Sequence, residues 1–299
     1  MRARRYSFCD DLFLARLERL HLVAKHVASR WSAGSRRSRR MGDGLEFADH
    51  RDYASGDDIR FVDWPFYARM EKLLLRMFHE HSESDVAILL DASASMAPGG
   101  NSEKFDHARR LAAALAFVAM GAMERVILLP FADKLMPPLR TGRNKSQILQ
   151  VLEFLDQARP GGPTDLSACC RQLVREYPSA LIVLLIGDLM NSRERLSDAL
   201  AWLKTGRRDV IVLQTYAPWE AQPALSGPTL LQWAEGPGRL NLDISEPLLE
   251  QYRQSWRESQ EAIRHTCIAR AVTYVPAATD VPMEELILQS LRKAGVLTD

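Results

Sequence analysis

Short apolar runs alternate with helical patterns along most of the chain after residue 84. Four of these runs are rich in β-branched and aliphatic residues and predict strands, at 85–91, 125–131, 180–188 and 209–216. The stretches between them have apolar residues three and four apart and predict helices, at 103–123, 145–157, 165–177 and 192–205. Near-continuous apolar strands that alternate with helices indicate an α/β fold, with a doubly wound, mostly parallel sheet covered on both faces.

Both ends of the chain depart from this pattern. Residues 13–28 have the apolar spacing of an amphipathic helix, and residues 30–40, rich in Ser, Gly and Arg, predict a loop or exposed arm. The last part of the chain predicts a hairpin, a long helix, a strand and a final helix, at 230–242, 246–270, 271–275 and 282–294. We therefore expect a helical and extended N-terminal region over 1–83 and an α/β domain with C-terminal elaborations over 84–299.

The composition is that of an ordinary globular protein, with 46% hydrophobic and 26% charged residues. The formal charge of +1 conceals an uneven distribution, because residues 1–40 carry eleven basic and three acidic side chains, a net +8, which leaves −7 for residues 41–299. The basic arm could contact nucleic-acid phosphates, with Trp31 available for stacking, but no nucleic-acid-binding motif surrounds it. We expect it to face an acidic partner surface or to promote solubility.

The cysteines and the apolar runs bear on the cellular location. Four cysteines are too few and too irregularly spaced for a disulfide framework, and no C-x-x-C pair occurs. The longest apolar runs are far shorter than the roughly 20 residues of a membrane span, and the first residues lack an apolar signal core. We expect a cytoplasmic protein in a reducing compartment, without membrane contact. Adjacent Cys169 and Cys170 lie in an apolar helical pattern and are expected to be buried rather than a redox pair.

Oxygen-bearing side chains follow three of the predicted segments. Asp91 ends the first strand and precedes Ser93 and Ser95, Thr164 follows a Gly-Gly-Pro turn, and Asp188 ends the third strand. Ligands bind at the carboxyl ends of the strands in open α/β sheets, and a hard cation such as Mg²⁺ prefers octahedral oxygen coordination. We expect the three hydroxyls to bind the cation directly and the two carboxylates to act largely through water. One position would stay open for an acidic side chain of a partner. The alternative is that these residues only cap the next helix and satisfy the loop.

The motif Asp91-x-Ser93-x-Ser95, with Thr164 and Asp188, resembles the metal-ion-dependent adhesion site (MIDAS) of von Willebrand factor A (vWA) domains. Upstream, residues 44–53 and 56–69 resemble the bacterial family catalogued as domain of unknown function 58 (DUF58). Two positions depart from the family pattern: Pro163 precedes Thr164, and Gly187 precedes Asp188 where many relatives carry Ser. Neither change removes a donor atom, so an intact site is expected.

The resemblance implies a Rossmann-like vWA domain whose MIDAS binds Mg²⁺ or Mn²⁺. It also implies a partner, since similar proteins are encoded beside MoxR-type AAA+ ATPases, with which they are thought to act in chaperone-like maturation of client proteins or in metal or cofactor insertion. No G-x-x-x-x-G-K-[ST] loop occurs in the sequence, so ATP hydrolysis would belong to another chain. The expected function is a non-enzymatic, metal-dependent protein-interaction module.

Two other functions stay open. A metal-dependent phosphatase or phosphotransferase also uses an Asp at the end of the first strand and a second, distant Asp. In this sequence Ser93 stands where such an enzyme would have another carboxylate. A nucleic-acid-binding adaptor would rest on the basic arm alone, so nucleic acid is not the expected partner.

Charged and aromatic residues alternate between residues 51 and 69. The candidate partner-binding residues in this segment are Arg51, Asp57, Asp58, Arg60, Asp63, Trp64 and Arg69. The alternative is a set of structural ion pairs that tie the N-terminal region to the sheet, which we favour because such alternation is common at domain seams. The nearby His79-Glu80-His81 has the spacing of a solvent-facing strand and lacks further metal ligands.

Overall fold

The computed structural model describes residues 6–10, 12–20, 46–79, 85–192 and 195–294, without the side chains of 46–49, 77–79 and 207. The described residues of 1–28 and 84–299 form one unit, called the main unit below, and those of 29–83 form a second, the small unit. The sequence predicts a single N-terminal region over 1–83. In the structure this region is divided between the two units, with its first residues in the main unit.

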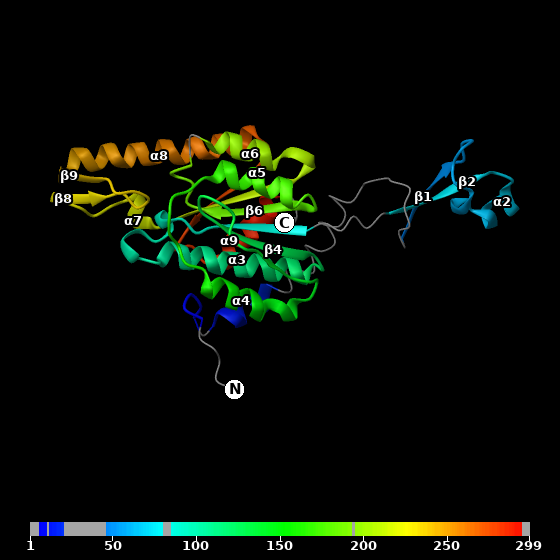
Figure 1. The fold of residues 1–299 in the computed structure, drawn as a ribbon, viewed down its shortest axis with the longest axis horizontal. Coiled ribbons are helices and arrows are strands. Elements are labelled where there is room, and N and C mark those ends of the chain that lie inside the picture. The colour runs from blue at the N-terminus through cyan, green and yellow to red at the C-terminus, as the bar shows by residue number, and fades with distance from the viewer. Residues whose placement is uncertain (1–5, 11, 21–45, 80–84, 193–194, 295–299) are drawn as a thin grey trace. The chain divides into compact units, whose positions relative to one another are not determined.

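A six-stranded sheet forms the centre of the main unit, with strand order β10-β7-β6-β3-β4-β5 (Figure 1). The strands are β3 (Asp85–Asp91), β4 (Arg125–Phe131), β5 (Leu139–Arg140), β6 (Ala180–Gly187), β7 (Asp209–Tyr216) and β10 (Thr273–Ala278). Neighbouring strands pair in parallel from β10 to β4, and the short β5 pairs antiparallel with β4. The predicted α/β fold with a mostly parallel sheet is confirmed.

Helices cover both faces of this sheet (Figure 1). On one face lie α3 (Glu103–Gly121), α4 (Ile148–Gln157) and α9 (Met283–Lys293), and on the other lie α5 (Leu166–Glu176), α6 (Leu196–Leu203) and α8 (Glu246–Ala269). Each corresponds to a predicted helix, with ends that differ by a few residues. In the described part of the chain, none of the helices combines the length and apolar character needed to cross a bilayer.

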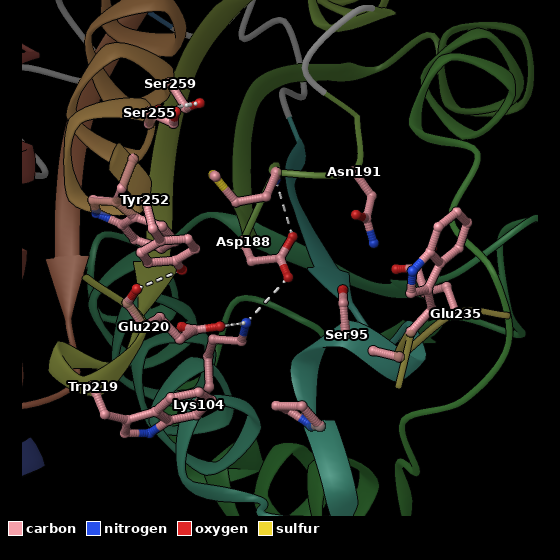
Figure 2. Close-up of a pocket in the computed structure, with 15 residues that line it drawn as sticks. Ser95, Lys104, Asp188, Asn191, Trp219, Glu220, Glu235, Tyr252, Ser255 and Ser259 are labelled. Atoms are coloured by element: carbon pink, nitrogen blue, oxygen red, sulfur yellow. Dashed lines mark hydrogen bonds and ion pairs between the residues drawn. The ribbon is translucent and has the colours of Figure 1, made fainter. Parts of the chain in front are cut away.

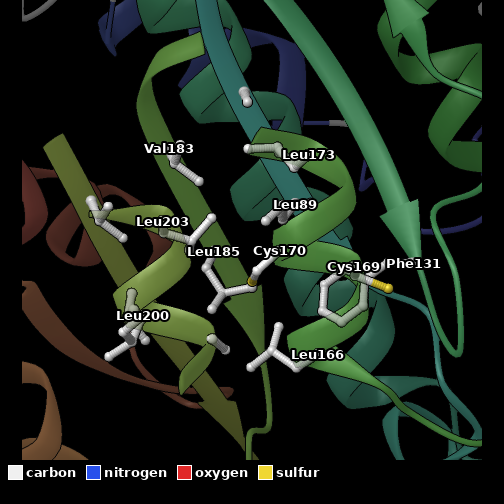
Figure 3. Close-up of a cluster of buried hydrophobic side chains, with 14 of the residues drawn as sticks. Leu89, Phe131, Leu166, Cys169, Cys170, Leu173, Val183, Leu185, Leu200 and Leu203 are labelled. Carbon is white, nitrogen blue, oxygen red and sulfur yellow. The ribbon is translucent and has the colours of Figure 1, made fainter. Parts of the chain in front are cut away.

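The core between the sheet and α5 and α6 contains the adjacent cysteines (Figure 3). Cys169 and Cys170 are fully buried among leucines of both helices and of β3 and β6. Burial raises the pKa of the Cys169 thiol to about 12, which leaves the thiol protonated and unreactive. Both thiols are free, so the prediction of buried, structural cysteines is confirmed.

The N-terminal segment packs on the α3 and α4 side of the main unit. Residues 13–20 are helical, and the rest of the predicted helix, like the basic arm at 30–40, lies outside the described residues. The Ser7 amide and hydroxyl both donate to Asp156 Oδ1 on α4 at 2.7 Å. The Arg109 guanidinium on α3 lies 4.6 Å from the ring centroid of Phe8. These contacts explain why the start of the chain belongs to the main unit.

Two elements follow β7 before α8 begins. The short helix α7 (Pro218–Ala221) leads into a two-stranded hairpin of β8 (Gly227–Gln232) and β9 (Arg239–Ile244). The hairpin was predicted around Gly236-Pro237-Gly238, and α7 was not. The turn of this hairpin lies at the carboxyl edge of the sheet.

The small unit has its own secondary structure. Strand β1 (Glu46–Asp52) pairs antiparallel with β2 (Leu74–His79), and between them lie a 3-10 turn (Ile59–Phe61) and helix α2 (Trp64–Met70). Strand β1 and helix α2 were not predicted, because mixed charged and aromatic residues conceal the strand and helix periodicities, and of β2 only the end at His79 falls in a predicted strand. His79 ends β2, while Glu80 and His81 lie outside the described residues.

His107 on α3 is expected to make the stability of the protein depend on pH. Its side chain is 4% exposed and its Nε2 has no hydrogen-bond partner within the described structure. Burial, aided by the charge of Arg110, lowers the pKa of His107 to about 4. In the unfolded chain His107 has an ordinary pKa of about 6.5, so it takes up a proton at a pH at which the folded protein does not. The free energy of unfolding therefore falls as the pH drops below about 6.5.

The expected loss from this histidine is about 2 kcal/mol between pH 7 and pH 5. Urea unfolding at both pH values should show this loss in the wild type and a smaller one in His107→Gln. His265→Gln, at an exposed position on α8, is the control and should retain the wild-type difference. Equal pH dependence in the wild type and His107→Gln would contradict the assignment.

Candidate functional site

Two loops at the carboxyl edge of the sheet are joined by backbone hydrogen bonds. The Gly161 amide donates to the Ala92 carbonyl (2.8 Å), and the Ala94 amide donates to the Gly162 carbonyl (3.0 Å). The loop that follows β3 and the loop that precedes α5 therefore lie side by side. This arrangement brings the two serines of the motif next to the segment that carries Thr164.

Asp91 and the two serines form the first part of the site. Asp91 is 2% exposed, and its Oδ1 accepts a hydrogen bond from the Ser93 amide (2.9 Å). Ser93 Oγ and Ser95 Oγ lie 3.0 Å apart and share a hydrogen bond, and both serines are buried. The motif thus turns back on itself, with one carboxylate and two hydroxyls at the end of β3.

Thr164 meets a carboxylate from the hairpin. The Thr164 amide donates to Glu235 Oε2 (3.0 Å), and its hydroxyl donates to Glu235 Oε1 (2.9 Å). Glu235 lies in the turn between β8 and β9. Although Pro163 precedes it, the Thr164 hydroxyl points to a carboxylate oxygen, that of Glu235.

Asp188 is paired with a buried lysine (Figure 2). Lys104 Nζ on α3 lies 3.1 Å from Asp188 Oδ2 and 2.7 Å from Glu220 Oε1 on α7, and Lys104 is 3% exposed. Burial alone would lower the pKa of Lys104, but the two carboxylates outweigh it and raise that pKa. The lysine therefore stays charged. The other oxygen of Asp188 accepts from the Met190 amide (3.2 Å).

The carboxyl group of Asp91 has an unusually high pKa. Burial, and then the charge of Asp188, raise the pKa of Asp91 to about 7, with a smaller contribution from Glu235. Hydrogen bonds from Ser93 oppose this shift. Burial and the charge of Asp188 both disfavour the ionised form of Asp91, and a cation beside Asp91 would relieve that cost.

Gly187 gives Asp91 its space. A Cβ atom at position 187 would lie 2.6 Å from Asp91 Cβ and 2.8 Å from Asp91 Oδ2. Contacts this short require one of the two residues to move. The glycine that departs from the family pattern is therefore matched to the position of Asp91 in this chain.

The donor set fits a small, hard cation. An octahedral Mg²⁺ site has metal–oxygen distances of about 2.0–2.1 Å, so neighbouring ligand oxygens lie about 2.9 Å apart. The pair Ser93 Oγ and Ser95 Oγ, at 3.0 Å, matches that edge. Three hydroxyls and two carboxylates are ligands suited to Mg²⁺ or Mn²⁺. Among the described residues, no three His, Cys, Asp or Glu side chains gather in a way that could hold a metal.

A cavity of about 820 Å³ opens beside these side chains (Figure 2). Its acidic side includes Asp188, Glu220 and Glu235, and Ser95 lies between Asp188 and Glu235. Aromatic residues from α7, the hairpin and α8 also line it: Trp219, Trp233, Tyr252 and Trp256. In Figure 2, Trp219 and Tyr252 lie beside Glu220. The cavity gives a macromolecular or small ligand a route to the edge of the sheet.

Four residues of the site were missed by sequence reasoning: Lys104, Gly187 as a spacing residue, Glu220 and Glu235. Lys104 is 84 residues from Asp188 along the chain, and Thr164 is 71 residues from Glu235. The hairpin turn itself was recognisable, but no local pattern indicates which carboxylate it brings to the site. The five predicted donors are brought to one edge of the sheet.

The small unit holds the other predicted residues in local contacts. Arg51 pairs with Asp57 (2.7 Å), Arg60 pairs with Asp58 (2.6 Å), and each pair lies within this unit. Asp57 also accepts from the Ala54 amide, and this hydrogen bond, followed by that of Arg51, lowers its pKa.

The remaining candidates lie at the start of α2. Asp63 Oδ1 accepts from the Phe66 amide (3.0 Å) as the helix cap, and Asp63 Oδ2 lies 2.9 Å from His50 Nε2. Trp64 is 53% exposed, and Arg69 donates to the Pro65 carbonyl (3.2 Å). These contacts are structural but lie within the small unit, so they are not the predicted ties to the sheet, and Trp64 lies at the surface.

This chain is similar to curated proteins and to solved structures. The uncharacterized protein Rv1480 of Mycobacterium tuberculosis and the uncharacterized protein Mb1516 of Mycobacterium bovis are each 26% identical over 235 residues, which are 76% of this chain and 72% of theirs. The crystal structure of the conserved hypothetical protein BatB from Bacteroides thetaiotaomicron is similar at 16% identity, over 71% of this chain and 98% of that one, with a TM-score of 0.39. The vWF domain of the type V pili tip protein Mfa5 from Porphyromonas gingivalis is similar at 11% identity, over 72% of this chain and 97% of that one, with a TM-score of 0.34.

The family model described as "Protein of unknown function DUF58" matches residues 49–262. The match includes most of the small unit, the edge of the sheet with all five predicted donors, and the hairpin. Since it covers more than half of the sequence, the chain belongs to the DUF58 family.

Proposed function

We propose that this chain is a non-enzymatic protein-interaction module that docks a partner through a divalent cation, Mg²⁺ or Mn²⁺, at a MIDAS-type site. The observation that supports it best is the gathering of five oxygen donors at one edge of the sheet. Two of them are buried carboxylates, Asp91 and Asp188, and two of them, Ser93 Oγ and Ser95 Oγ, are spaced at 3.0 Å. Two buried carboxylates whose charges disfavour one another favour cation binding.

The hydroxyls and the carboxylates would have different roles at the cation. The hydroxyls of Ser93, Ser95 and Thr164 would hold the cation directly. The carboxylates of Asp91 and Asp188 would orient its water ligands. A cation with few anionic ligands remains electrophilic, so it supplies a position at which a carboxylate from a partner can bind. Lys104 would keep Asp188 in place from the side of α3.

The partner in this proposal is a MoxR-type AAA+ ATPase in the cytoplasm, acting on client proteins in chaperone-like maturation or in metal or cofactor insertion. Its support is the resemblance of the sequence to proteins encoded beside such ATPases. The aromatic cavity beside the site supports docking of a protein segment rather than of an isolated ion, because aromatic side chains are enriched at protein interfaces.

Replacing Asp91 with Asn tests the metal-dependent mechanism. Mn²⁺ affinity, measured from the signal of free Mn²⁺ in electron paramagnetic resonance, is expected to fall at least about tenfold. The fold should persist, because the charged form of Asp91 is disfavoured in the native protein. Asp209→Asn, at the exposed amino end of β7, is the matched control and should bind Mn²⁺ as the wild type does.

Capture of the candidate ATPase should be weakened in Asp91→Asn, should be retained in Asp209→Asn, and should disappear in EDTA. Unchanged Mn²⁺ affinity and unchanged capture in Asp91→Asn would refute the docking mechanism. Phosphatase turnover that is lost in this variant would instead support the phosphotransferase alternative.

A further inference from the structure

Glu235 stands where a docking carboxylate would be expected. Its two oxygens accept from the amide and the hydroxyl of Thr164, at 3.0 Å and 2.9 Å. Thr164 is one of the three hydroxyl residues assigned to the cation. A partner carboxylate that bound a cation at this threonine would have to occupy the same space.

The spacing of these oxygens suits joint coordination. Thr164 Oγ1 and Glu235 Oε1 are 2.9 Å apart, which is about the edge of an octahedral Mg²⁺ shell. The Ser93 and Ser95 hydroxyls have the same spacing, at 3.0 Å. The site therefore presents two pairs of oxygens at ligand spacing, and the second pair includes a carboxylate from the chain itself.

The turn of the hairpin places Glu235 beside Thr164. The Trp233 amide donates to the Gly238 carbonyl (2.9 Å), which closes the turn. The indole of Trp233 lies against the backbone of Gly238, where a Cβ would come within 2.8 Å of the ring. The turn that carries Glu235 is thus closed by a backbone hydrogen bond and by a contact of the indole with its own backbone.

The same hairpin can move away from the site at a small cost in free energy. Side chains along β8 alternate between half-buried and exposed, and in β9 only Ile244 is buried among these described residues. Large apolar side chains such as Leu230 and Leu240 remain about half exposed. A two-stranded hairpin with little buried area is among the elements that open most easily.

We propose that Glu235 is an internal ligand of the cation, and that it occupies the docking position until an acidic side chain of the partner displaces it. This inference rests on the proposed function, because it needs a cation at the site. It identifies the partner segment as one that carries an acidic side chain able to replace Glu235. The aromatic cavity next to the hairpin is where the residues around that acid would lie.

Mn²⁺ binding and water-proton relaxation test the inference on the full chain. Glu235→Gln should bind Mn²⁺ at least about tenfold more weakly than the wild type, because a carboxylate ligand is lost. Each bound Mn²⁺ should relax water protons more strongly, because water takes the vacated position. Added acetate should reverse that gain in Glu235→Gln and have little effect on the wild type.

Asp243→Asn is the matched control, since Asp243 lies exposed in β9 of the same hairpin and the substitution makes the same change in charge. It should behave as the wild type does. Equal Mn²⁺ affinity and relaxation in Glu235→Gln and the wild type would overturn the internal ligand while leaving the cation site intact. Absence of Mn²⁺ binding in the wild type would overturn the proposed function, and the internal ligand with it.

Discussion

Replacing Lys104 with Met is expected to lower the free energy of unfolding by about 3–5 kcal/mol. The ammonium group of Lys104 lies 3.1 Å from Asp188 and 2.7 Å from Glu220, and all three side chains are largely buried. Met fills a similar volume, so packing is retained while the charge is lost. Two carboxylates are then left close together without their cation, and this uncompensated charge is the source of the loss.

Urea unfolding followed by circular dichroism measures the effect. The matched control is Arg264→Met on α8, which breaks an exposed ion pair with Glu261 and should leave the unfolding midpoint unchanged. At the proposed cation site, millimolar Mg²⁺ should restore part of the stability of Lys104→Met, because the cation would lie beside Asp188. A midpoint equal to that of the wild type would show that Lys104 does not compensate the two carboxylates.

Replacing Gly187 with Ala is expected to destabilise the protein by about 3 kcal/mol and to weaken Mn²⁺ binding at least about tenfold. The new Cβ would come within 2.6 Å of Asp91 Cβ, in the middle of a sheet where β3 and β6 are paired on both sides. Either the strands separate or the Asp91 side chain moves. The second response removes the carboxylate from its hydrogen bond with the Ser93 amide.

The matched control is Gly161→Ala, at the same edge of the sheet, where a Cβ would meet no atom within 4 Å. Its urea midpoint and Mn²⁺ affinity should stay near those of the wild type. Normal stability and normal Mn²⁺ binding in Gly187→Ala would mean that Asp91 has more freedom than the structure indicates.

The two predictions separate the roles of the neighbouring groups. Lys104 balances the charge of Asp188 from the side of α3, whereas Gly187 makes room for Asp91 within the sheet. A cation would sit among the same carboxylates, so stability and metal affinity should be coupled in both variants. This coupling also makes Mg²⁺ dependence of the urea midpoint a direct measure of the cation site.

The local sequence pattern was sufficient to predict the strands where the chain is uniformly apolar. The strands predicted at 85–91, 125–131 and 209–216 coincide with β3, β4 and β7, because strands buried on both faces read as continuous apolar runs. The last strand was predicted at 271–275, but β10 runs over Thr273–Ala278. It includes Pro276, which is tolerated because β10 lies at the edge of the sheet.

The sequence alone determined the α/β class, most helices and strands, the hairpin, and the group of proposed donor residues from Asp91 to Asp188. These features depend on periodicity, or on residues that the ends of parallel strands must bring to one edge. Only the tertiary structure decided which groups face those donors: the Lys104 ammonium at Asp188, the backbone of Gly187 against Asp91, and the carboxylate of Glu235 at Thr164. The physical reason is that charge compensation, close packing and side-chain hydrogen bonds arise between groups far apart in the chain, which meet only when the helices and the hairpin pack around the sheet.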